Sequence, residues 1–155
     1  MKRVLVDANF WIGLTDKREK HHASAESFFE EMVRRRDPVV LPWPCVYEVF
    51  RSRSVKSSDI FLAFDAALRA LSHASVAGCE KIGDEQYRTG AWLNYDEMQI
   101  RKQWRKLSFV DLVLRQMLVD DALDIGVLVT ADVGDFQDIC VKRRIRLTDW
   151  TVEHG

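Results

Sequence analysis

The feature that most restricts the fold is the first apolar run, Val4-Leu5-Val6, which leads directly into Asp7-Ala8-Asn9. A short continuous apolar run bounded by polar residues is typical of a buried strand in a parallel sheet. An acid at the carboxyl end of such a strand lies where open α/β sheets bind ligands. Asp7 could equally do no more than cap the helix that follows. This stretch alone leaves both interpretations open.

The size and composition favour one ordinary globular domain over residues 1–155. Hydrophobic residues make up 47% of the chain and charged residues 30%, which argues against a disordered chain. The net charge of -1 argues neither for nor against a nucleic acid partner.

The cysteines and the hydropathy bear on where the protein works. Its three cysteines are odd in number, far apart and not in a metal-binding spacing, so we expect a reduced, cytoplasmic protein. No apolar run approaches the roughly 20 residues that cross a bilayer, and we expect no membrane association. Because the N-terminus leads directly into a predicted core strand, we also expect no signal peptide.

Hydrophobic periodicity along the chain predicts alternating strands and helices. Helices are expected over about 10–14, 22–36, 44–50, 58–71, 108–122 and 133–142, and further strands over about 38–42, 127–130 and 145–147. Residues 74–78 could form a short strand or an extended link. The pattern over 84–106 predicts two helices with a break near Asn94, and Gly126 is expected to stop the helix that begins at Ser108. This alternation predicts an α/β domain with a mainly parallel sheet.

Four acids follow or lie near the predicted strands: Asp7, Glu48, Asp111 and Asp132, the last with Asp135 close behind. Each has a purely structural interpretation. Glu48 could pair with Arg51 or Arg53 on the surface. Asp111 could cap its helix and pair with Arg115, four residues on. Asp132 could simply belong to a turn.

Together, the acids favour a metal site. Two of them follow buried strands, and the carboxyl ends of parallel strands meet at one edge of a sheet. Carboxylates gathered in a partly dehydrated site repel one another unless a cation neutralises them. Ligands that are all oxygen suit Mg²⁺ or Mn²⁺. Zinc is disfavoured because no Cys or His accompanies the acids in a ligand spacing.

With these acids in their sequence motifs, the chain resembles a PIN-domain ribonuclease, most of all the VapC-type toxins of bacterial toxin–antitoxin pairs. The resemblance covers nearly the whole chain, and no one motif is specific, but their order and spacing are. The motifs are Val6-Asp7-Ala8-Asn9, Tyr47-Glu48-Val49, Leu107-Ser108-Phe109-Val110-Asp111 and Val129-Thr130-Ala131-Asp132-Val133-Gly134-Asp135-Phe136.

The resemblance implies a three-layer α/β/α domain that hydrolyses RNA phosphodiester bonds with Mg²⁺ or Mn²⁺. By position, the catalytic and metal-binding acids would be Asp7, Glu48, Asp111 and Asp132. Asn9 and Thr130 would support them, and Asp135 is the alternative fourth acid.

Basic residues are candidates to hold the RNA backbone, although a solvated surface explains most of them equally well. The candidates are Arg51, Arg53, Arg101 and Lys102, with Lys17, Arg18, Lys20 and Arg105 as further possibilities.

The resemblance further implies a cognate antitoxin protein and a homodimer. Other interpretations are a PIN-domain RNA-processing nuclease without an antitoxin, and a non-catalytic module such as a degenerate PIN or receiver-like domain. A phosphatase of the haloacid-dehalogenase type is disfavoured, since Asn9 stands where such enzymes place a second aspartate.

Overall fold

The structure is a computed structural model that describes residues 2–51, 58–100 and 107–152. The elements in chain order are β1 (Arg3–Val6), α1 (Ala8–Thr15), α2 (His22–Arg35), β2 (Val39–Pro42), α3 (Trp43–Arg51), α4 (Ser58–Ala74), β3 (Cys79–Ile82), α5 (Glu85–Ile100), α6 (Phe109–Val119), a 3₁₀ turn η1 (Asp121–Leu123), β4 (Ile125–Val129), α7 (Val133–Arg143) and β5 (Arg146–Thr148).

The five strands form one sheet in the order β3-β2-β1-β4-β5, and every neighbouring pair is parallel. In β1, Leu5 lies opposite Val40 of β2 on one side and Leu128 of β4 on the other. The predicted α/β class and parallel sheet are therefore confirmed. Because β1 is the central strand, the residue that follows it lies at the middle of one sheet edge.

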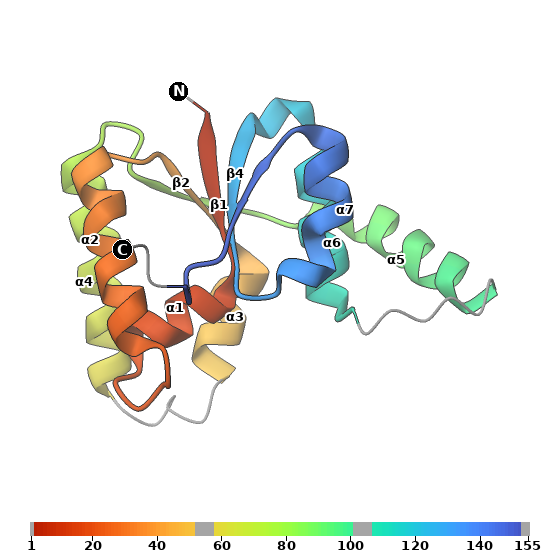
Figure 1. The fold of residues 1–155 in the computed structure, drawn as a ribbon. Helices are drawn as coiled ribbons and strands as arrows, with labels where there is room; N and C mark the ends of the chain where they lie inside the picture. The colour runs from red at the N-terminus through yellow and green to blue at the C-terminus, as the bar shows by residue number, and fades with distance from the viewer. Residues whose placement is uncertain (1, 52–57, 101–106, 153–155) are drawn as a thin grey trace.

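Helices cover both faces of the sheet and produce three layers (Figure 1). Helices α2 and α4 lie on one side of the strands, and α6 and α7 lie on the other. The carboxyl ends of β1, β2 and β4 point toward the lower end of the view, where α1, α3 and α6 begin. This end of the sheet is where the predicted acids belong.

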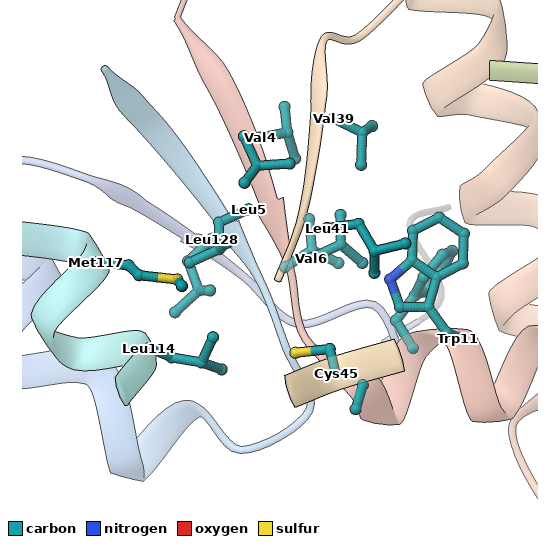
Figure 2. Close-up of a cluster of buried hydrophobic side chains, with 14 of the residues drawn as sticks. Val4, Leu5, Val6, Trp11, Val39, Leu41, Cys45, Leu114, Met117 and Leu128 are labelled. Carbon is teal, nitrogen blue, oxygen red and sulfur yellow. The ribbon is translucent and has the colours of Figure 1, made fainter. Parts of the chain in front are cut away.

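The core fills the space between the sheet and these helices, as Figure 2 shows for side chains such as Leu41, Leu114 and Leu128. Strand β1 contributes Leu5 and Val6, which are both fully buried. Continuous burial on both faces explains why this strand is an uninterrupted apolar run.

Two sequence expectations about secondary structure were wrong. Helix α5 continues through Asn94 to Ile100 without a break. Its Gly90 lies against Gln116 on α6, and the side-chain amide of this glutamine would have to move to admit a Cβ. Helix α6 ends at Val119, so Gly126 does not stop it and lies instead inside β4. Of the two alternatives for residues 74–78, the link is the one found, because β3 begins only at Cys79.

Two further findings concern the expected setting of the protein. All three cysteines are free thiols. Among the helices within the described ranges, none is long and apolar enough to cross a membrane.

Candidate functional site

Asp7 follows β1 directly and is buried at the middle of the sheet edge. Its Oδ1 accepts a hydrogen bond of 2.7 Å from the backbone N–H of Ala8, so Asp7 is the N-cap of α1. Its Oδ2 accepts a hydrogen bond of 2.8 Å from the hydroxyl of Thr130, which follows β4. Capping and a place at the sheet edge are thus compatible: one oxygen holds the helix, and the other faces the neighbouring strand.

The amide of Asn9 links Asp7 to Asp132. Its Nδ2 lies 3.2 Å from Oδ2 of Asp7 and 3.1 Å from Oδ2 of Asp132, and the Thr130 hydroxyl lies 3.3 Å away. Thr130 also accepts a hydrogen bond of 3.0 Å from the backbone N–H of Asp132. The two residues predicted to support the acids therefore contact them directly. Two carboxylates from different strand ends are held together by neutral donors.

Glu48 lies in α3, which begins as soon as β2 ends. Its side chain is half-buried, and burial together with the nearby charges of Asp111 and Asp132 raises its pKa. Arg51, one helical turn on, opposes this rise in pKa. Arg53, the other partner considered for Glu48, lies outside the described residues.

Asp111 occupies the first turn of α6, at the position that the sequence predicted. Its backbone N–H donates to the Ser108 hydroxyl at 3.1 Å, and its Oδ2 accepts from the Ser108 backbone N–H at 3.0 Å, which completes a capping box. The ion pair considered between Asp111 and Arg115 is not the one that this arginine makes. Arg115 instead binds both carboxylate oxygens of Asp138 on α7 at 2.8 Å.

Arg115 also holds the start of α7 against α6. It donates a hydrogen bond of 2.8 Å to the backbone carbonyl of Asp135. After burial, the charges of Asp135 and Asp132 also raise the pKa of Asp111. Both candidates for the fourth acid thus belong to the cluster. Asp132 is the one bonded through Asn9 to Asp7.

Burial and neighbouring carboxylate charges raise the pKa values of Asp7, Glu48 and Asp111, as expected for like charges in a partly dehydrated place. Burial is the main cause at Asp7 and raises its pKa from 3.8 to about 7, with Asp111 and Glu48 adding to the rise. The hydrogen bonds from Thr130 and Ala8 act in the opposite direction. Burial is also the main cause of the raised pKa of Asp111, against which the bonds from Ser108 act. At neutral pH the cluster therefore favours a bound proton or another cation.

In their present conformations, no three His, Cys, Asp or Glu side chains lie close enough to hold a metal ion within residues 2–51, 58–100 and 107–152. The basic residues proposed to hold RNA are only partly described. Arg51 is exposed at the end of α3, whereas Arg101, Lys102 and Arg105 lie outside the described ranges, as Arg53 does. Arg18 is exposed and pairs with Asp16.

One residue of the site escaped sequence reasoning. Trp150 follows β5, and its indole N–H donates a hydrogen bond of 2.9 Å to Oδ1 of Asn9. Trp150 also lines an open groove of about 750 Å³ between α2 and the last strand, together with Phe28 and Arg35. Asn9 and Trp150 are 141 residues apart in the chain, and no local sequence pattern predicts a contact over such a separation.

No family model matches this chain, and no curated protein matches it either.

Proposed function

We propose that this protein is a Mg²⁺- or Mn²⁺-dependent endoribonuclease of the PIN-domain kind, acting as the toxin of a toxin–antitoxin pair. One observation carries the proposal. The acids that follow β1 and β4 and those carried by α3 and α6 lie near a single edge of the sheet, where burial and the neighbouring carboxylate charges raise the pKa values of Asp7, Glu48 and Asp111. Such a repulsive cluster is destabilising by itself, and a divalent cation would relieve it.

The donor set fits a hard divalent ion. Asp7, Glu48, Asp111 and Asp132 offer only carboxylate oxygens, which suit Mg²⁺ or Mn²⁺ better than zinc. To bind an ion, these carboxylates must move closer together, since no three His, Cys, Asp or Glu side chains among the described residues now lie close enough to hold one. Asp132 is exposed and Glu48 half-buried, so both have room to turn toward an ion.

When bound, the ion would lower the pKa of a coordinated water and stabilise charge on the attacked phosphate. The chain's own residues keep the carboxylates in place for this. Thr130 and Asn9 orient Asp7, and the capping box fixes Asp111 on the first turn of α6. Arg51 supplies a positive charge beside Glu48, at a place where an RNA phosphate would meet it.

The biological role is part of the same proposal. An antitoxin whose tail covers the acids, and a homodimer, are expected from the resemblance to VapC-type toxins. We place the protein in the cytoplasm, where RNA is the substrate and the three free thiols stay reduced. An RNA-processing nuclease without an antitoxin has the same site chemistry, whereas a non-catalytic binding module would keep the acids and cleave nothing.

RNA cleavage by the purified protein tests the proposal. Labelled RNA should be cut with Mn²⁺ or Mg²⁺ and stay intact with EDTA. Asp111→Asn should lower the cleavage rate at least 100-fold while the protein remains folded by circular dichroism. Glu30→Gln, which changes an exposed acid on α2, is the matched control and should cleave as the wild type does. Equal cleavage by wild type and Asp111→Asn would contradict the metal-site assignment. Absence of cleavage would favour the binding module.

A further inference from the structure

Trp150 reaches the acidic cluster through Asn9, and its indole N–H is one of two donors that fix which way the Asn9 amide points. The Oδ1 atom of Asn9 accepts two hydrogen bonds, one of 2.9 Å from the Trp150 indole and one of 3.2 Å from the backbone N–H of Ala131. Both donors are N–H groups that cannot accept, so the oxygen must face them. The NH₂ group is thereby directed at Asp7 and Asp132.

The opposite amide orientation would reverse the chemistry of the site. It would place an amide oxygen against two carboxylates and leave the indole N–H of Trp150 facing an NH₂ group. A buried donor without an acceptor is destabilising by about 1–3 kcal/mol. The indole therefore favours, together with the backbone N–H of Ala131, the orientation in which Asn9 counteracts the repulsion between Asp7 and Asp132.

The indole is itself held firmly. Its ring packs edge-on against Phe10 with centroids 5.7 Å apart and against His21 at 6.2 Å. Gly13 of α1 lies beneath the ring, and a Cβ at this glycine would come within 2.6 Å of the indole Cη2. A rigid ring on a buried side chain makes a fixed hydrogen-bond donor for the amide.

We infer that Trp150 is a positioning residue for the acidic cluster, acting through the amide of Asn9. The inference rests on the proposed function, because it assigns the cluster to metal binding. Groups that orient metal ligands typically change metal affinity 10–100-fold when they are mutated. Trp150→Phe keeps an aromatic ring in place and removes the N–H, so we expect the dissociation constant for Mn²⁺ to rise about tenfold.

Trp11 provides a matched control. It is a fully buried tryptophan, and its indole N–H has no hydrogen-bond partner among the residues that the structure describes. Trp11→Phe and Trp150→Phe thus remove the same atoms from the core, and both are expected to reduce stability. Only the change at Trp150 removes a donor from Asn9.

The test measures Mn²⁺ binding by electron paramagnetic resonance, without RNA, for wild type, both tryptophan variants, Asn9→Ala and the Asn9→Ala/Trp150→Phe pair. Weaker binding in Trp150→Phe but not in Trp11→Phe is expected. If the tryptophan acts through the amide, the double variant should bind Mn²⁺ as Asn9→Ala alone does. Equal losses from both tryptophan variants, or additive losses in the double variant, would overturn the inference.

A second measurement separates this inference from the proposed function. In ¹⁵N NMR spectra recorded without metal, the side-chain amide protons of Asn9 should exchange with water faster in Trp150→Phe than in wild type or Trp11→Phe. Unchanged exchange overturns the positioning role, even in a protein that cleaves RNA. Faster exchange in a protein that binds no Mn²⁺ supports the role of the tryptophan and contradicts the proposed function.

Discussion

Replacing Asp7 with asparagine tests whether the site is destabilised by its own charge. The pKa of Asp7 is about 7 in the folded chain, against an ordinary value of 3.8. Since one pKa unit corresponds to about 1.4 kcal/mol, ionising Asp7 lowers the free energy of unfolding by about 4 kcal/mol once the pH exceeds 7. Asp7→Asn removes this charge but weakens about two hydrogen bonds, from Thr130 and Asn9, each worth about 1 kcal/mol.

The pH dependence follows from the direction of the shift. Because the folded pKa is the higher one, the unfolded chain loses its proton first as the pH rises. The stability given by protonated Asp7 is complete below about pH 4 and is lost as the pH rises through 7. Asp7→Asn should therefore match wild type near pH 5.5 and exceed it by about 2 kcal/mol near pH 8.5. The raised pKa values of Glu48 and Asp111 add a slope of the same sign in both proteins.

Urea unfolding in EDTA, followed by tryptophan fluorescence, measures the difference. Glu30→Gln on α2 controls for the loss of an exposed acid and should show no pH-dependent difference from wild type. A stability advantage of Asp7→Asn that stayed constant from about pH 5.5 to 8.5 would contradict the raised pKa of Asp7, as would a gain of wild type over this variant as the pH rose.

Three further substitutions probe the supports of the site, each by urea unfolding. Gly13→Ala should lower the free energy of unfolding by about 1–3 kcal/mol, because the new methyl group overlaps the ring of Trp150. Gly134→Ala is the control: this glycine has open space around it, so the change should be neutral or stabilising. Equal effects of the two substitutions would contradict this packing. Ser108→Ala removes the capping box of α6 and should lower the free energy of unfolding by about 1 kcal/mol. An unchanged midpoint of urea unfolding would show that the cap contributes nothing to stability. Arg115→Met removes the hydrogen bonds that tie α7 to α6, so it should lower the free energy of unfolding by about 1–3 kcal/mol and also lower Mn²⁺-dependent cleavage. Full cleavage activity would argue against a role for α7 in the site.

Much of the fold was predictable because its determinants are local. Continuous apolar runs marked β1, β2 and β4, and the Ser108–Asp111 spacing marked the start of α6. Helix α5 was mispredicted because it packs against α6, and no short window of sequence contains that contact.

The site residues, too, were predictable where their position depends on local sequence and not where it depends on distant contacts. Sequence position placed Asp7, Asn9 and Thr130 at strand ends, and the parallel topology then brought them together. The partner of Arg115 and the role of Trp150 depend on contacts between distant elements. A helical spacing suggested Asp111 for the arginine, but the geometry gave it Asp138. Both misses came from contacts between elements far apart in the chain.

The central claim is that the carboxylates at the sheet edge are kept for a divalent cation. Calorimetric titration with Mn²⁺ in buffers of different ionisation enthalpy tests it directly. With a pKa of about 7, Asp7 is protonated in about nine-tenths of the molecules at pH 6, so an ion that binds there must displace about one proton. Near pH 9 almost none should be released. Binding that releases protons at pH 6 but not at pH 9, and that is lost in Asp7→Asn, is the predicted result. No binding, or binding without this difference in proton release, would contradict the claim.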